Sequence, residues 1–193
     1  MHRNGIVIGI VASLVLLATA APVAALDLTP AVQAELDRLK QTAAEWAADP
    51  LIVGAVKAQN GKGPVAGMDN AKWKSIRRSD PTIQAFVQSP AGQFLKAKIQ
   101  ASSGTLDKAF LNAAQGEKVA FAEKTISYLH KGQEKFDVPM STGKPWQMSK
   151  QWFDESLQGF ALQVSAPVMD GGKVIGVLVA SVPVVHLDKI AKK

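Results

Sequence analysis

A set of side chains that could bind a small polar molecule falls between residues 124 and 156 of the chain. It consists of three aromatic residues, two lysines and one acid: Lys124, Tyr128, Lys131, Trp146, Trp152 and Asp154. Aromatic rings can wall a pocket and lysines can pair with a carboxylate, so the set suits a small organic anion or an amino acid. Each member also has a structural alternative. The rings could pack in a core, the lysines could be solvated, and the acid could accept backbone N–H bonds in a loop.

The same sequence argues against catalysis and metal binding. It contains no cysteine, and its three histidines, His2, His130 and His186, lack the spacing of a zinc site. There is no G-x-S-x-G motif, and the adjacent acids Asp154 and Glu155 would point in opposite directions on a strand. We therefore expect no catalytic residue, no metal and no cofactor. An unrecognised hydrolase is the least favoured hypothesis.

The first 25 residues differ in character from the rest. Arg3 provides a positive start, residues 6–18 are apolar and uncharged, and Val23, Ala24 and Ala25 are the small residues that a signal peptidase reads. This pattern predicts a signal peptide over residues 1–25 that exports one mature domain, residues 26–193, to the periplasm. The alternative is an uncleaved segment that anchors the chain in the membrane.

The charge of the chain is mildly basic. The formal net charge is +6, and removing residues 1–25 takes away one basic residue, Arg3, which leaves +5 for the mature domain. This charge is spread along the sequence, so we expect weak attraction to anions and no nucleic-acid partner.

Residues 159–185 should form the central hairpin of a sheet. Strict alternation of apolar side chains over residues 160–168 predicts a strand, and Asp170-Gly171-Gly172 provides a tight turn. Residues 174–182 are apolar on both faces, which is typical of a strand covered on both sides. On the first strand, Gln163 and Ser165 point away from the apolar face, either to solvent or into a pocket.

The remaining elements indicate an α+β fold. A long helix over residues 27–48 carries an apolar stripe, and short helices follow at Asp49-Pro50, Asp80-Pro81 and Ser89-Pro90. Strands at 108–114, 118–124 and 151–154 complete a five-stranded antiparallel sheet with helices on one side. Residues 132–136 resemble a short helix, and residues 137–150 are expected to form a loop. The stripe could pack on the domain or pair two copies, and we expect a weak parallel homodimer through helix 27–48.

Three stretches of this sequence carry a resemblance to a known family. They are residues 119–128, residues 132–136 (GQEKF), and WFDES at 152–156 leading into LQVSAPVMDGGKVIGVLV at 162–179. In this order they resemble the single-Cache, or PDC-type, domain of bacterial extracytoplasmic sensors, across roughly residues 27–190. The resemblance implies a PAS-like fold with a long N-terminal helix and a small-molecule pocket between the sheet and the connection formed by residues 125–155.

If the pocket lies there, the residue types suggest roles for the side chains named first. Tyr128 and Trp152 would be pocket walls, and Lys124 or Lys131 would pair with a ligand carboxylate. The expected function is a periplasmic sensor module for an organic acid or amino acid. Such domains usually lie between two transmembrane helices, and this sequence shows no second membrane segment, so a membrane receptor or kinase would be the signalling partner. The alternative is a structural or interaction protein that fills the pocket with its own side chains and assembles through its long helix.

Overall fold

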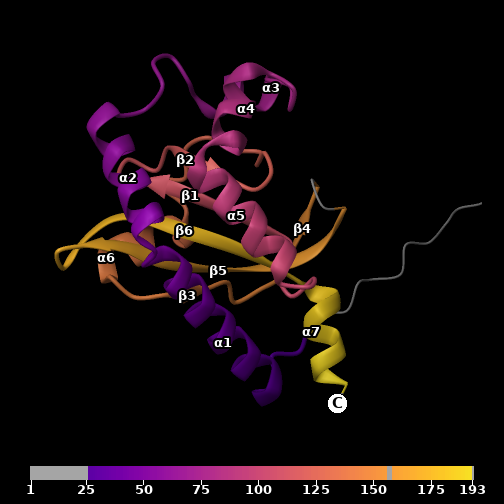
Figure 1. Cartoon of the computed structure of the whole chain (residues 1–193). Helices are drawn as coiled ribbons and strands as arrows, with labels where there is room; N and C mark the ends of the chain where they lie inside the picture. The colour runs from indigo at the N-terminus through magenta and orange to yellow at the C-terminus, as the bar shows by residue number, and fades with distance from the viewer. Residues whose placement is uncertain (1–25, 156–157, 193) are drawn as a thin grey trace, which may run out of the picture.

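The computed structural model describes residues 26–155 and 158–192, and the predicted signal peptide lies outside them (Figure 1). The helices are α1 (Pro30–Ala47), α2 (Pro50–Lys62), α3 (Asn70–Ser75), α4 (Pro81–Gln88), α5 (Pro90–Ala101), α6 (Glu134–Thr142) and α7 (Val184–Ala191). The strands are β1 (Lys108–Ala113), β2 (Lys118–Phe121), β3 (Trp146–Gln147), β4 (Trp152–Asp154), β5 (Gly159–Asp170) and β6 (Lys173–Pro183). Among these residues no helix is both long and apolar enough to cross a membrane.

The predicted α+β class is confirmed, with one strand more than expected. The sheet is antiparallel, its order is β2-β1-β6-β5-β3, and β4 also pairs with β5. The sixth strand, β3, lies in the stretch expected to be a loop, where Trp146 faces Ser165 and Gln147 faces Val164. A two-residue strand has no periodicity that a sequence pattern could reveal.

The central hairpin is confirmed. β5 and β6 pair along nearly their whole length, and β6 lies between β5 and β1 in the sheet. Both turn glycines have positive φ, +53° at Gly171 and +82° at Gly172, which L side chains rarely adopt. These values fit the tight turn, and a register shift between Val168 and Met169 then sets the pairing of the rest of the hairpin. That register decides which side chains face each side of the sheet.

The long helix α1 covers one face of this sheet. Pro30 opens it, and the Thr29 side chain caps it by accepting a hydrogen bond from the Val32 amide. The apolar stripe contacts β5 and β6, and its members are 0–7% exposed: Val32, Leu36, Leu39, Ala43 and Trp46. Of the two roles predicted for the stripe, packing on its own domain is the one observed. The homodimer stays a prediction, but the apolar stripe is buried within its own domain and is not available as the interface.

Helices lie on both faces of the sheet, whereas one side was expected. α1, α2 and α5 pack with the Ala109, Leu111 and Leu178 face. The other face carries Phe110, Val177 and Val179, which pack with side chains of α3, α4 and α6. The strands carry apolar residues in both alternating positions, so both faces have to be covered.

Helix α6 corrects the loop predicted for residues 137–150. It continues through Pro139 to Thr142, although a proline inside a helix removes one backbone hydrogen bond. Phe136 and Pro139 are both buried, and the helix packs on β5 and β6. Tertiary packing therefore outweighs the local preference of a stretch rich in Pro, Gly and Ser. The helix also brings Lys135 to the pocket described next.

Candidate functional site

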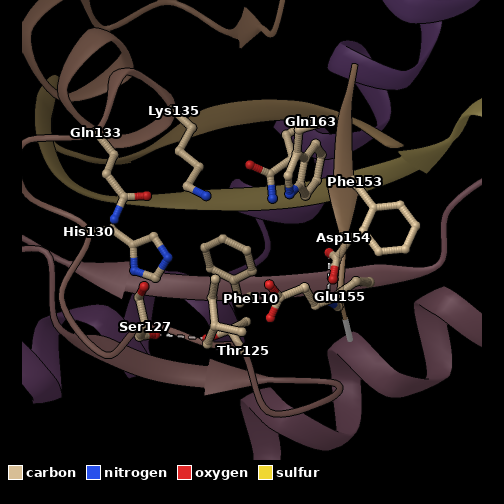
Figure 2. Close-up of a pocket in the computed structure, with 13 residues that line it drawn as sticks. Phe110, Thr125, Ser127, His130, Gln133, Lys135, Phe153, Asp154, Glu155 and Gln163 are labelled. Atoms are coloured by element: carbon tan, nitrogen blue, oxygen red, sulfur yellow. Dashed lines mark hydrogen bonds and ion pairs between the residues drawn. The ribbon is translucent and has the colours of Figure 1, made fainter. Parts of the chain in front are cut away.

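A cavity of about 160 Å³ lies between the sheet and the connection formed by residues 125–155, where the family resemblance implied a pocket (Figure 2). β1 and β5 form its floor with Lys108, Phe110 and Gln163. Residues 125–127, the start of α6 and β4 enclose it from the other side. Lys108 and Gln163 are both register partners of Ser181 on β6, so the three form one row across the sheet.

A buried ion pair forms one wall of the cavity. Lys108 Nζ lies 2.9 Å from Asp154 Oδ2, and the two side chains are 4% and 9% exposed. β1 provides the lysine and the end of β4 provides the acid, which pairs residues 46 positions apart. Next to the pair, burial raises the pKa of Asp107 to about 6, although the positive charge of Lys108 opposes this shift.

Lys135 gives the cavity a second cation. It is the second residue of α6, and Figure 2 shows its side chain pointing from the helix toward Phe110 and Gln163. Burial lowers its pKa to about 8, with Asp154 opposing the shift and Lys108 adding to it. Within the described part of the chain its ammonium has no hydrogen-bond or ion-pair partner, and its nearest ring contact is Phe110, whose centroid is 5.8 Å away.

Two further basic side chains surround the Phe110 ring. Lys118 Nζ lies 3.3 Å from the ring centroid, and the centroid of the His130 ring lies 4.8 Å from it. Burial is the main cause that holds both pKa values well below their ordinary range, and Lys135 lowers both further. Lys118, His130 and Lys135 thus converge on one aromatic ring. No acidic side chain is among the causes of the pKa shifts of Lys118 and His130.

Several buried polar atoms on the pocket side of the sheet have no hydrogen-bond partner among residues 26–155 and 158–192. These atoms are Lys118 Nζ, His130 Nδ1, Ser165 Oγ and both side-chain polar atoms of Asn112. Buried polar groups in folded proteins are nearly always hydrogen-bonded. The pocket side of the sheet therefore has free hydrogen-bonding capacity on two basic side chains, Lys118 and His130, and two neutral ones, Asn112 and Ser165.

Of the six residues proposed from the sequence, Trp152 and Asp154 line this cavity. Trp152 pairs with Ala161 on β5, and Asp154 takes part in the ion pair described above. Their role in binding a ligand stays a prediction, now with a defined place. The alternative suggested for Asp154 was that it accepts backbone N–H bonds in a loop. In the structure its side chain pairs with Lys108 on β1.

The other four lie elsewhere. Tyr128 is fully buried in the hydrophobic core on the Phe110 face of the sheet, which we call the second core. Its ring lies 5.3 Å from that of Trp73, and its hydroxyl accepts a hydrogen bond from the Val65 amide. Lys124 Nζ lies 5.3 Å from the Trp73 ring, Lys131 is exposed, and Trp146 sits on β3. None of the four is among the residues that line the cavity, so the predicted pairing of a ligand with Lys124 or Lys131 would need a different site.

The sequence interpretation missed Lys108 and Lys135 and read His130 as a lone, exposed or satisfied histidine. One signal was present for Lys108, because it alternates with Phe110 on a strand whose other face is apolar. Lys135 falls in the short helix expected at residues 132–136, but no local pattern indicated that this helix would direct it to the pocket. Gln163, left open between solvent and pocket, lines the cavity. Among the described residues, no group of His, Asp or Glu gathers as a metal site would.

Comparison with known proteins finds similarity to solved sensor domains. No protein family's sequence profile matches the chain, and no curated protein matches it. The Escherichia coli DcuS sensor domain is 14% identical, with a TM-score of 0.49 over 83% of this chain and 99% of that one. The sensory domain of the Campylobacter jejuni chemoreceptor Tlp3 with isoleucine bound is 16% identical, with a TM-score of 0.45 over 86% and 69%.

A third similar structure is the sensor domain of the Vibrio cholerae histidine kinase DctB. It is 13% identical, with a TM-score of 0.44, and the match covers 83% of this chain and 60% of that one. All three are sensor domains, the class that the sequence resembles. At these identities and TM-scores the likeness does not extend to the ligand.

Proposed function

We propose that the chain is an extracytoplasmic sensor module that binds a small organic acid or amino acid and reports through a membrane receptor or kinase. The observation that carries this proposal is the cavity of about 160 Å³ beside the buried Lys108–Asp154 pair, into which Lys135 projects with no ion-pair partner among the described residues. An open cavity favours ligand binding over the alternative, a structural protein whose pocket is filled by its own side chains.

The size of the cavity limits the ligand. An engineered protein cavity of about 150 Å³ accommodates benzene, which has six heavy atoms. A ligand of about six to nine heavy atoms therefore fits, which corresponds to a short carboxylic acid. An amino acid of this size also fits, because two acidic side chains, Asp154 and Glu155, line the cavity and could pair with its ammonium.

The pKa of Lys135 gives the binding a pH dependence. Its amine is protonated below about pH 8 and loses its charge above that value. A carboxylate should therefore bind best below pH 8. Above it, binding requires uptake of a proton, so affinity should fall by up to about tenfold per pH unit.

A thermal-shift screen with short carboxylates and amino acids tests the proposal, because a ligand that binds the folded state raises Tm. For a compound that raises Tm, Lys135→Met should weaken binding by about tenfold to a hundredfold in calorimetric titration, the worth of one charge-assisted hydrogen bond. Lys131→Met is the matched control, since this exposed lysine lies on the same connection and outside the cavity.

Two results would contradict the proposal. If no acid or amino acid raises Tm, the cavity is a packing feature and the structural alternative takes its place. If both lysine variants lose affinity equally, the ligand is attracted by overall charge and is not held in this cavity.

A further inference from the structure

The positive charge of the chain is concentrated in one region, which corrects the earlier interpretation that it is spread along the sequence. Residues 50–105 contain eight Lys or Arg side chains and two acids, a net +6 that equals the charge of the whole chain. Residues 26–49, which include α1, contain two basic and five acidic side chains. The charge is therefore polarised between neighbouring elements, and the pocket described above does not use the basic part.

The densest part of this region is a basic lobe formed by residues 62–78, from the end of α2 through α3. Its five basic side chains are all exposed: Lys62, Lys72, Lys74, Arg77 and Arg78. Its one acid, Asp69, caps α3 by accepting a hydrogen bond from the Lys72 amide at 2.7 Å. α3 lies at the end of the molecule away from α7 and the C-terminus (Figure 1).

The basic lobe is held rigidly against the pocket segment. Asn70 Oδ1 accepts hydrogen bonds from the Tyr128 and Leu129 amides, both at 2.8 Å. Trp73 donates its indole N–H to the Thr125 carbonyl at 2.8 Å, and Tyr128 accepts from the Val65 amide at 2.8 Å. These contacts join the lobe to residues 125–130, several of which line the cavity.

We infer that the basic lobe is a docking surface for an acidic face of a partner protein. Arg78 pairs with Glu123 at 3.8 Å, and the other four cations have no ion pair among the described residues. Charge complementarity selects an anionic surface, because these four cations at one end of the molecule create a local positive potential. An exposed apolar side chain within the lobe, Val65 at 39%, favours a protein over a lipid or nucleic-acid surface, since protein interfaces combine apolar contacts with arginine. The rigid backbone lowers the entropy lost on docking.

The test uses a labelled poly-glutamate peptide as the probe, with binding followed by fluorescence anisotropy at about 20 mM and 200 mM salt. The wild-type protein should bind the peptide more weakly at the higher salt. The charge-reversed variant Lys72→Glu/Lys74→Glu/Arg77→Glu should lose affinity by about tenfold or more, since three exposed charge pairs are removed. These side chains are exposed, so Tm should be nearly unchanged. The neutral set Lys72→Gln/Lys74→Gln/Arg77→Gln provides a second variant if the first is unstable.

The matched control changes the net charge by the same amount at exposed positions outside the lobe: Lys144→Glu/Lys150→Glu/Lys173→Glu. It should retain the wild-type affinity. Equal loss in the two triple variants would overturn the inference, because binding would then follow net charge alone. It is also overturned if vesicles of phosphatidylcholine and phosphatidylglycerol bind through the lobe while the peptide does not, which would assign a lipid surface. The probe does not need the pocket ligand, so the outcome is independent of the proposed function.

Discussion

Replacing Lys118 by Met should stabilise the domain by an amount that depends on pH. The side chain is 0% exposed, its Nζ lies 3.3 Å from the Phe110 ring centroid, and no described residue accepts a hydrogen bond from it. Burial, followed by the charges of Lys135 and Lys108, holds its pKa well below the ordinary range. Methionine has a similar length and fills the same space without a group to ionise.

The sign of the effect follows from proton binding. Below the ordinary lysine pKa of about 10.4 the unfolded chain holds a proton on Lys118, whereas the folded protein holds it only below the lowered pKa. Between these two values the free energy of unfolding should rise with pH by about 1.4 kcal/mol per unit. The variant lacks this contribution. Its advantage over wild type should therefore shrink by about 3 kcal/mol across two pH units within that window.

Urea unfolding at several pH values up to 10 provides the measurement, and the difference between variant and wild type removes the titrations that both share. The exposed residue Lys144 provides the control, since Lys144→Met removes an ammonium that lies in solvent and should leave the free energy of unfolding nearly unchanged. The reasoning is refuted if the difference between Lys118→Met and wild type is constant across this range. It is refuted equally if methionine destabilises the protein at every pH.

Three other predictions concern the ion pair, the long helix and export. Lys108→Met should cost about 3–5 kcal/mol by removing the ammonium that pairs with buried Asp154, and adding Asp154→Leu should recover most of that loss in urea unfolding at pH 7. Leu36→Glu should unfold the domain, because it places a carboxylate at a position that is 0% exposed; a wild-type dimer that becomes a folded monomer in this variant, by light scattering and circular dichroism, would instead support the dimer. Mass spectrometry of the exported protein should find Leu26 at the N-terminus, and a full-length chain in the membrane fraction would favour the anchor.

The features that the sequence predicted correctly have local causes. Asp49, Asp80 and Ser89 each accept a hydrogen bond from a backbone amide at the start of the helix that follows them, as expected from a capping residue before proline. The glycines after Asp170 adopt the conformation that their turn requires. Each of these results depends on a few adjacent residues, whose chemistry permits few other conformations.

The site depended on contacts that no local pattern encodes. Lys108 reads as the polar start of a strand and meets Asp154 only because β4 and β1 lie on the same sheet. Tyr128 falls within the connection expected to cross the sheet, residues 125–155, but its ring packs against Trp73 of α3 in the second core. Lys135 reaches the cavity because α6 packs on β5 and β6 and directs its first turn toward the pocket. Long-range packing decided each of these positions.

The register of the central hairpin restricts how this sequence can change over evolutionary time. Alternate residues of β6 serve different purposes: Ser181 faces the row that contains Lys108 and Gln163, while Ala180 and Val182 face α1. Deleting one residue inside the strand would exchange the two faces over the rest of its length and destroy the helix-facing core and the pocket floor together. Relatives should therefore differ by substitutions within β5 and β6, with insertions and deletions confined to the exposed tip at Gly171 and Gly172.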